Sequence, residues 1–545
     1  MLNVQHPCDE GVVLAARPPA RRAEAGRAWV LAATILGSSL AFIGGTVVNV
    51  ALPALQRDLG ATVADVQWVV EAYALLLSAL LLVGGSLGDR LGRRRVYAIG
   101  VCIFAAASAL CGVAATVEQL VVVRAVQGAG AALVVPGSLA IISASFGVRE
   151  RGWAIAIWSS FSALTSAAGP VFGGWLTEHL SWRWAFSANV PLGAVVLALL
   201  RHVPESRDPE PTGPLDWPGA VLVTIGLGGV VYGLVESARI DAPAWHVWGA
   251  LAAGTAALLT LAAVEARSRS PMVPPTLFRS RTFTGANVLT FFLYGGLGST
   301  FFFLPFNLIQ VQRYSATAAG AASLPFVSIL FLLSRRSADL VDRFGAKVPL
   351  VVGPTITAAG YVLLARQGIG GSYWTTFFPP LVTLGLGMAV SVAPLTTTVM
   401  NAVDVRHAGI ASGINNAVSR TAGLLAVALM GVLVVHVFGR ELDRGLARAA
   451  LAPDVVAAMR VERVKLAGAE PPRDATTHER DAVRRAVAEA FVAGFRAMAL
   501  VAAALALAAA GTAALMIDGV PSRRVRAACT PGLTGEPAPR SSRSR

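Results

Sequence analysis

Charged residues are scarce in this chain: they make up 14% of its 545 residues, whereas hydrophobic residues make up 55% and the mean hydropathy is +0.63. A soluble fold has no interior large enough for so much apolar surface, so the composition excludes an ordinary water-soluble protein. Cysteine is scarcer still. The four cysteines form no CxxC pair and no Cys–His cluster, so neither a disulfide framework nor a zinc site is indicated: Cys8, Cys102, Cys111 and Cys529.

Motifs of common enzyme classes are also missing. No HExxH zinc motif, GxxxxGK[ST] phosphate loop or GxSxG nucleophile elbow stands in a suitable context. ATP-driven transport and hydrolysis in the membrane are therefore disfavoured. We expect the protein not to be an enzyme and to hold no metal or organic cofactor.

Long apolar runs are what the chain has in abundance. A membrane-spanning helix needs roughly 20 mostly apolar residues, and fourteen segments qualify. They are expected near residues 28–50, 67–88, 96–115, 118–145, 152–177, 184–200, 216–236, 246–265, 284–310, 316–334, 348–366, 375–399, 408–437 and 495–518. The sequence therefore predicts an all-α polytopic membrane protein.

The formal net charge of +14 would suit a nucleic-acid partner, so the placement of the basic residues decides the question. With the N-terminus inside, 27 of the 45 Lys and Arg residues fall in predicted cytoplasmic segments. The short external loops hold five, namely Arg57, Arg183, Arg239, Arg313 and Arg366. This asymmetry is the one that the positive-inside rule requires, so we expect both termini in the cytoplasm and no nucleic-acid partner.

The densest charge lies between the second and third apolar runs, in Gly85-Ser-Leu-Gly-Asp89-Arg90-Leu-Gly92-Arg93-Arg94-Arg95. Such a stretch between two spans must form a short loop at a bilayer surface. Its arginines place that loop on the cytoplasmic side.

Three arginines remain inside apolar runs: Arg124, Arg420 and Arg496. A charge at bilayer depth costs from about 3 to well over 10 kcal/mol, so such residues usually face a bundle interior or an aqueous cavity. Gln127 shares the helical face of Arg124, and Asn416 precedes Arg420 by one turn. Arg496 is close enough to the outer interface to extend its side chain to water.

Glu71 is the only carboxylate well inside an apolar run, within Trp68-Val-Val-Glu71-Ala-Tyr73. Desolvation disfavours a charged carboxylate, so an acid in a partly dry cavity can take up and release protons near neutral pH. We therefore predict that Glu71 is a proton-binding group. The alternative is a position near the outer interface, where Glu71 is solvated or paired and only contributes to packing.

Glycine and proline mark the fifth run, in Gly169-Pro170-Val-Phe-Gly173-Gly174. Proline removes a backbone donor and small residues let helices approach closely, so a kinked and tightly packed helix is predicted. A generic contact between membrane helices is the alternative.

Together these stretches resemble the major facilitator superfamily, and specifically its fourteen-helix drug:proton antiporter branch. Residues 85–95 are similar to the family's loop between helices 2 and 3, residues 124–132 to its helix 4 motif, and residues 169–174 to the helix 5 motif of exporters. Their occurrence in this order is highly specific. Asp339-Leu-Val-Asp342-Arg343-Phe-Gly345 resembles a degenerate copy of the first motif, as internal duplication predicts.

The resemblance implies two six-helix bundles joined by two additional spans. The expected divisions are a cytoplasmic tail (1–27), a first bundle (28–200), the additional helices and their linkers (201–283), a second bundle (284–518) and an Arg-rich cytoplasmic tail (519–545). A monomer in the cell membrane is expected.

The resemblance also implies export of amphipathic drugs or an antibiotic in exchange for protons, by alternating access. The partners would be the small molecule, protons and the lipid bilayer. Proton-coupled uptake of a nutrient, siderophore or other metabolite is the alternative, which the helix 5 motif disfavours. A membrane receptor or enzyme is a more distant one.

Site residues follow from the same resemblance. Glu71 and Arg124 would couple protons to transport, and the helix 2–3 loop would be a cytoplasmic gate formed by Gly85, Asp89, Arg90, Gly92, Arg93 and Arg94. In the outward-facing state Asp89 would pair with basic or helix-end groups. Polar and aromatic side chains inside the spans are candidates for a substrate cavity: Asn49, Tyr73, Gln127, Tyr294, Asn307, Asn415, Asn416 and Arg420.

Two positions depart from the family's pattern. Gly44 stands where relatives usually carry Asp, so proton coupling falls to Glu71 or is lost. Thr165 stands where the helix 5 pattern usually has Gly, which is a mild change.

One extramembrane segment is long, residues 438–490 between the last two spans. Its ten basic residues are nearly balanced by nine acidic ones, which suits an external location. The spacing of its apolar residues predicts short amphipathic helices broken at Pro471-Pro472. We expect a solvated cap or tether, and a lid that screens substrates is the alternative.

Overall fold

A computed structural model describes residues 21–207, 216–239, 242–268, 274–403, 408–449 and 451–518. These ranges form helices and contain no strand. Thirteen described helices are long and apolar enough to cross a membrane, and a shorter apolar stretch covers Trp184–Leu200. The predicted all-α polytopic fold is thus confirmed, and the short stretch corresponds to the sixth of the fourteen predicted spans. The tail from residue 519 and the N-terminal tail up to residue 20 lie outside the described residues.

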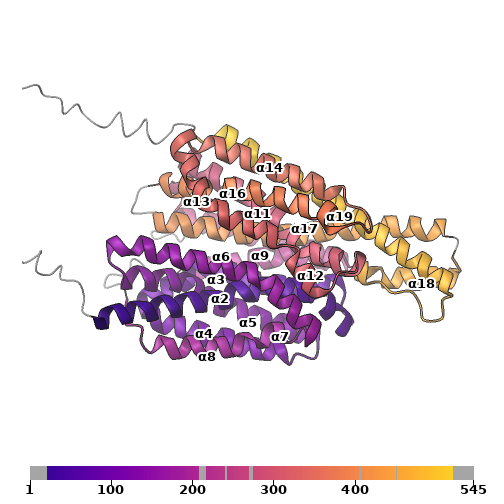
Figure 1. Ribbon diagram of the computed structural model, residues 1–545, viewed down its shortest axis with the longest axis horizontal. Helices are drawn as coiled ribbons and strands as arrows, with labels where there is room; N and C mark the ends of the chain where they lie inside the picture. Colours follow the sequence, from indigo (N-terminus) through magenta and orange to yellow (C-terminus); the bar gives the residue numbers. More distant parts are fainter. Residues whose placement is uncertain are drawn as a thin grey trace, which may run out of the picture. The chain divides into compact units, whose positions relative to one another are not determined.

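The chain divides into two compact units. Unit 1 comprises Met1–Met272 and Leu308–Ala321, so the two additional helices group with it. Its helices are α2 (Arg21–Asp58), α3 (Val63–Leu91), α4 (Arg93–Gly112), α5 (Val117–Ser145), α6 (Val148–His179), α7 (Trp184–Ser187), α8 (Asn189–Leu200), α9 (Trp217–Ser237), α10 (Ala244–Arg267) and α12 (Ala316–Ala321). Helices α2 to α8 appear in Figure 1 in indigo to magenta as one bundle.

Unit 2 comprises Val273–Asn307 and Ala322–Arg545. A π-helical turn, η2 (Asn307–Val311), follows its first long helix. Its helices are η1 (Pro275–Arg279), α11 (Arg281–Phe306), α13 (Leu324–Phe344), α14 (Lys347–Ala365), α15 (Tyr373–Thr376), α16 (Phe378–Asn401), α17 (Ala408–Arg448), α18 (Pro453–Glu462), η4 (Arg463–Gly468) and α19 (Thr477–Met516).

Polar side chains set where several of these helices begin. Thr62 accepts a hydrogen bond from the Asp65 backbone N–H, and Asp65 accepts one from the Thr62 N–H, which is a capping box at the start of α3. Thr476 and Glu479 form the same arrangement at the start of α19. Asp216 caps α9. Each cap satisfies backbone donors that a helix leaves free, at about 1 kcal/mol per cap.

Glycine brings the helices of each unit into backbone contact. In unit 1, a Cβ added at Gly84 of α3 would collide with the Ala132 carbonyl of α5. A Cβ added at Gly128 of α5 would collide with the Tyr73 carbonyl of α3. In unit 2, a Cβ at Gly387 of α16 would lie 2.7 Å from the Gly353 carbonyl of α14. Such small-residue contacts are how helices associate in lipid, where the hydrophobic effect does not drive them together.

The ends of α3 and α13 show the internal duplication expected from the sequence. Each helix ends at a glycine with positive φ, Gly92 at 109° and Gly345 at 75°. Residues other than glycine rarely adopt this backbone conformation. Both copies of the Asp-Arg-x-Gly pattern therefore end a helix in the same way. The side chains of Asp339 and Asp342 lie outside the described ones.

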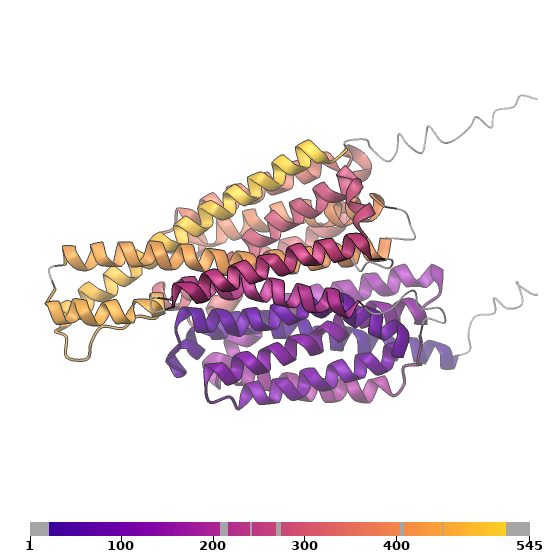
Figure 2. The ribbon, with the colours of Figure 1, turned by 180° about the vertical axis from the view of Figure 1, so that it is seen from behind.

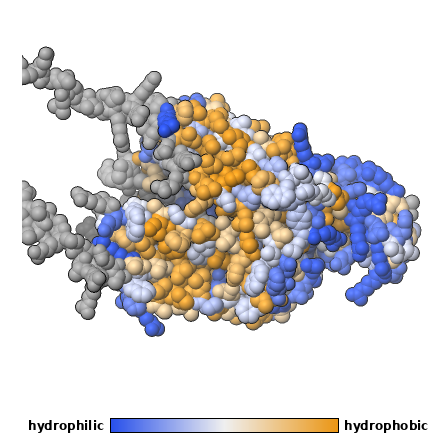
Figure 3. All heavy atoms as spheres, viewed as in Figure 1, coloured by the Kyte–Doolittle hydropathy of each residue, from blue (hydrophilic) through white to orange (hydrophobic). Residues whose placement is uncertain are grey.

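Helices α17 and α19 are longer than a bilayer requires. They have 41 and 40 residues, hence lengths of about 60 Å, against a hydrocarbon core of about 30 Å. Their ends and α18 form an extension of unit 2, which Figure 2 shows in orange and yellow. Hydrophilic side chains cover this extension in Figure 3, whereas orange hydrophobic side chains cover spanning helices.

The segment 438–490 is therefore largely helical. It begins as the continuation of α17 to Arg448 and ends as the first turns of α19 from Thr477, where short separate amphipathic helices were expected. The predicted break at Pro471-Pro472 is confirmed, since residues 469–476 are not helical.

Candidate functional site

Arg124 of α5 is completely buried in unit 1. Its Nε donates a hydrogen bond to the Val69 carbonyl at 2.9 Å. Its Nη1 donates to the Gly44 carbonyl at 3.2 Å and to Gln127 Oε1 at 2.6 Å. All three acceptors are neutral. A guanidinium stays charged in proteins, so this charge is held by amide and carbonyl dipoles.

Aromatic and polar side chains complete the surroundings of Arg124. The ring centroids of Tyr73 and Phe186 lie 4.2 and 5.7 Å from the guanidinium carbon, within the range of cation–π attraction. The Tyr73 hydroxyl donates to a backbone carbonyl of α2 at 2.9 Å. Gln127 Nε2 donates to Ser108 Oγ at 2.7 Å. Tyr73 and Gln127, predicted as cavity residues, are thus engaged in bonding around Arg124.

Glu71 of α3 is 1% exposed, and neither of its carboxylate oxygens has a hydrogen-bond partner. No ion pair involves it within the part of the chain that the structure describes. An ionised carboxylate buried in this way costs several kcal/mol, so this conformation accommodates the protonated acid. The alternative of a solvated or paired Glu71 does not fit this position.

Gly44, where the resemblance implies an Asp, contacts the same arginine through its main chain. Its carbonyl accepts the hydrogen bond from Arg124 Nη1. A Cβ at this position would lie 2.7 Å from Phe104 Cζ, and Phe104 is fully buried. The absent acid is therefore replaced by a backbone dipole, and a core phenyl ring fills the space that a side chain would need.

The stretch 85–95 was predicted to form a loop, but α3 continues to Leu91 and α4 begins at Arg93, so only Gly92 interrupts the two helices. Its positive φ turns the chain within one residue. This α3–α4 junction holds the first of two charge clusters. Asp89 of α3, for which the resemblance implies a basic or helix-end partner, pairs with Arg93 of α4 across Gly92, with Oδ1 to Nη2 at 2.8 Å. Both groups are partly exposed, so the pair alone contributes little, about 0.2–1 kcal/mol. Gly85, one turn before Asp89 on α3, packs against α5, where a Cβ would lie 3.6 Å from Pro136.

The second cluster centres on Glu205, which sequence reasoning missed. Its carboxylate accepts hydrogen bonds from the backbone N–H groups of Arg94 and Arg95 at 3.0 and 3.2 Å, and Arg94 Nη1 donates to the Val203 carbonyl at 3.0 Å. Glu205 thus caps the start of α4, where a negative charge is stabilised by the helix dipole. A Cβ at Gly92 would lie 2.8 Å from this carboxylate. The sequence offered three acids in the segment 201–215 after the sixth predicted span, and nothing in it singled out Glu205 from Asp208 and Glu210.

The helix 5 motif makes two backbone contacts from α6. A Cβ at Gly173 would lie 2.7 Å from the Val47 carbonyl of α2. A Cβ at Gly174 would collide with the Ala316 carbonyl, and one at Gly320 with the Pro170 carbonyl. The motif therefore packs α6 tightly between α2 and α12, as its small residues predicted.

Two further polar contacts join the same elements. Glu178, near the end of α6, accepts a hydrogen bond from the Thr317 backbone N–H at 2.9 Å at the start of α12. Thr165, which stands in place of the family's usual glycine, lies with its Oγ1 3.1 Å from Ser39 Oγ of α2. The departure at Thr165 thus adds a hydroxyl contact.

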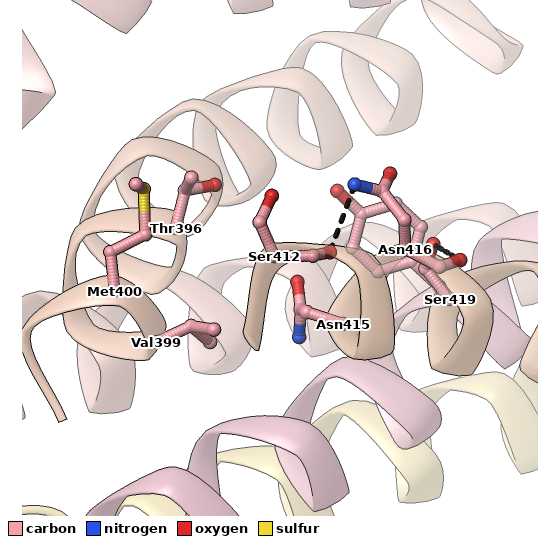
Figure 4. A pocket seen from close by; sticks show the side chains of 8 residues that line it. Thr396, Val399, Met400, Ser412, Asn415, Asn416 and Ser419 are labelled. Carbon is pink, nitrogen blue, oxygen red and sulfur yellow. Dashed lines mark hydrogen bonds between the residues drawn. The ribbon is translucent and has the colours of Figure 1, made fainter. Parts of the chain in front are cut away.

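Unit 2 holds a polar pocket between α11, α16 and α17. Three of the predicted cavity residues line it, namely Tyr294, Asn415 and Asn416, beside Thr396, Val399, Met400, Ser412 and Ser419. Figure 4 shows α17 supplying both asparagines, with Asn416 Nδ2 donating to the Ser412 carbonyl at 3.1 Å. Asn415 is fixed by Nδ2 donating to Thr290 Oγ1 at 2.7 Å. The pocket presents amide and hydroxyl groups to a small molecule beside one methionine and one valine.

The remaining candidates are dispersed. Asn49 is half-buried on α2 with Oδ1 unpartnered, Asn307 is fully buried, and Arg420 is half-buried on α17. Arg496 Nε donates to the Ala365 carbonyl at 3.0 Å. Throughout the described ranges, no group of three or more His, Cys, Asp or Glu side chains is placed to hold a metal ion.

Comparisons with known proteins place this geometry among membrane transporters. The family model described as Major Facilitator Superfamily matches residues 34–427. The tetracenomycin C resistance and export protein of Streptomyces glaucescens is 33% identical over 522 residues, which cover 92% of this chain and 93% of that protein. The multidrug resistance protein Stp of Mycobacterium tuberculosis (strain CDC 1551 / Oshkosh) is 34% identical over 496 residues, covering 87% and 89%.

A solved structure shares the fold. It is a bacterial homolog of the human lysosomal transporter Spinster, in an inward-facing and unoccupied conformation. It aligns with a TM-score of 0.59 at 19% identity and covers 89% of this chain and 97% of that chain. At this identity the likeness concerns the fold alone.

Proposed function

Because this chain belongs to the major facilitator superfamily, and is thus a multi-pass membrane transporter and not an enzyme, we propose that it exports amphipathic drugs or an antibiotic in exchange for protons. The export direction is supported by its similarity to proteins named for resistance and export. The proton gradient across the cell membrane would drive a monomer with cytoplasmic termini and no bound cofactor.

The observation that carries the proposal is the carboxyl of Glu71, which is buried within a membrane-spanning helix and has no hydrogen-bond partner. In this conformation the acid holds its proton, because no donor or cation stabilises the charged form. A second conformation that opens Glu71 to the cytoplasm releases the proton. Alternating access then couples proton entry to substrate exit, since each ligand shifts the same equilibrium.

The other residues have supporting roles in this mechanism. Arg124 keeps a fixed positive charge in unit 1 and orders α2, α3 and α5 through its hydrogen bonds. The pocket beside Tyr294 and Asn416 in unit 2 offers a substrate aromatic contact and amide hydrogen bonds. Asp89 and its arginines gate the cytoplasmic side by exchanging ion-pair partners.

A compound panel tests the function. The chain is expressed in a drug-sensitive bacterial host, and accumulation of aromatic cations, macrocycles and polyketide antibiotics is measured with and without an uncoupler. We expect lower accumulation of at least one amphipathic compound, reversed by the uncoupler. Higher accumulation instead would indicate uptake, and efflux that persists with the uncoupler would exclude proton exchange.

A further inference from the structure

Helix α9, the first of the two additional spans, packs on the face of α3 that carries Glu71. The ring centroid of Trp68 lies 6.0 Å from that of Tyr232 on α9. A Cβ at Gly228 of α9 would lie 3.4 Å from Leu75 Cδ2. Trp68 and Leu75 stand three residues before and four residues after Glu71, so all three share one helical face. Glu71 therefore lies along α3 between two of its contacts with α9, those of Trp68 and Leu75.

The facing surface of α9 is apolar. Between Trp217 and Val235 the helix carries no Asp, Glu, Lys, Arg or His, and Tyr232 is its one ionisable side chain. Val231 and Val235 are fully buried. An apolar surface offers a carboxylate neither a cation nor a strong donor, so α9 favours the protonated form of Glu71.

The charged groups on the other helices packed against α3 do not face Glu71. Arg124 of α5 bonds to the Val69 carbonyl, two residues from Glu71 and on the opposite side of the helix. Glu236 and Arg239 are at the external end of α9, where Arg239 pairs with Asp65 at 3.5 Å. The other Arg, Lys, Asp and Glu residues of α2, α4 and α5 lie toward the helix ends, and they are Arg21, Arg22, Glu24, Arg27, Arg57, Asp58, Arg93, Arg94, Arg95 and Glu118.

The second additional helix, α10, supports α9 from behind. A Cβ at Gly229 would lie 2.9 Å from the Gly254 Cα, so the two backbones are in contact. The outer side of α10 exposes large apolar side chains, with Trp245, Trp248 and Leu259 at 73%, 70% and 68%. Such a face suits lipid contact. The order from α3 outward is thus Glu71, α9, α10 and lipid.

We propose that α9 is a wall of the Glu71 proton site and shields this carboxyl from lipid, so that the two additional helices serve proton coupling as well as joining two bundles. The inference rests on the proposed function, because it takes Glu71 as the proton carrier. Its test does not need a substrate.

Labelling with dicyclohexylcarbodiimide tests the wall directly. This apolar reagent partitions into lipid and adds to protonated carboxyls there. The full chain in phospholipid vesicles is exposed to the reagent, and the rate of adduct formation at Glu71 is measured by peptide mass spectrometry. We expect slow labelling in the wild type and a rate about tenfold higher in Gly228→Leu, because a large side chain at the Leu75 contact overpacks the helix pair.

Two variants separate the wall from general damage. In Gly228→Leu/Leu75→Ala the space for the new side chain is restored, and labelling returns near the wild-type rate. Gly249→Leu is the matched control, because a Cβ at Gly249 on α10 has nothing within 4 Å. It leaves the labelling rate unchanged.

A reference carboxyl keeps the test decisive if Gly228→Leu does not fold. Leu259→Glu places an acid on the exposed face of α10, where it labels fast. Labelling of wild-type Glu71 as fast as at position 259, or an unchanged rate in folded Gly228→Leu, overturns the wall. Normal proton-driven export by Glu71→Gln instead overturns Glu71 as the carrier and leaves the labelling result standing.

Discussion

Arg124 and Glu71 illustrate two ways of placing an ionisable side chain inside a membrane protein. Arg124 keeps its charge because three neutral oxygens and two aromatic rings surround it. Glu71 has no such partners, so it is stable when protonated. The two residues lie on opposite sides of α3, which allows a fixed charge and a titrating group to coexist.

Replacing the acid isolates the titrating group. Glu71→Gln keeps the shape and the neutral charge of a protonated glutamate but cannot release a proton. We expect gradient-driven efflux to fall to the level seen with an uncoupler. The dissociation constant of the substrate for the purified protein should change by less than about threefold, which corresponds to less than about 0.7 kcal/mol, because the variant keeps the neutral form of the side chain. Efflux in cells and equilibrium binding measure the two effects. Full efflux by this variant would remove Glu71 from the mechanism.

Introducing the acid that the resemblance implies at position 44 tests the departure at Gly44. Because a Cβ here meets Phe104 at 2.7 Å, Gly44→Asp should destabilise the protein by about 1–3 kcal/mol without adding a transported proton. Thermal unfolding and the pH dependence of transport are the measurements. Gly45→Asp is the control, since a Cβ there lies 3.7 Å from Tyr73. A changed proton stoichiometry in Gly44→Asp alone would contradict the expectation.

At the scale of elements, the packing of α6 depends on glycines that have no side chain. Its Gly173 and Gly174 admit the backbones of α2 and α12, and Glu178 caps α12 from the end of the same helix. Backbone contact fixes the spacing of these helices, because a carbonyl cannot move aside as a flexible side chain can. The motif thus sets the distances from α6 to α2 and α12, because its glycines have no side chains.

Two glycines of the same helix provide a matched pair. Gly174→Ala should lower stability by about 1–3 kcal/mol, because its Cβ meets the Ala316 carbonyl oxygen. Gly152→Ala has open space around its Cβ and should be neutral or stabilising by up to about 1 kcal/mol through helix propensity. Unfolding temperatures of the two purified variants give the comparison. Equal effects would show that the α6–α12 contact does not limit stability.

At the scale of the whole molecule, charge distribution and helix length both indicate that the extension of unit 2 lies outside the membrane. Helices α17 and α19 exceed a bilayer by roughly half their length, and α18 joins them in a hydrophilic surface. The positive-inside rule predicts that the segment 438–490, with its nearly balanced charge, lies on the external side.

Cysteine labelling tests this orientation. In a background without the native cysteines, Arg460→Cys on α18 should react with a membrane-impermeant maleimide in intact cells. Arg151→Cys, near the start of α6, should react only after permeabilisation. Both side chains are exposed, so accessibility differs by membrane side alone. The opposite pattern would invert the topology.

The sequence by itself determined the class of the protein. Apolar runs of membrane length indicated the spans, and three ordered motifs identified the family, because both signals are local in the chain. The same reasoning selected Glu71 and Arg124, since a charged residue within an apolar run is visible without a structure.

Tertiary structure alone decided which residues meet. Arg124 bonds to backbone carbonyls of α2 and α3, which have no sequence signal, and Glu205 reaches α4 from more than a hundred residues away. Only packing shows that Phe104 occupies the space beside Gly44 and that α9 covers the Glu71 face. Hydropathy and motifs report the residue and its segment, whereas contacts between helices depend on rotation and depth that many distant side chains set together.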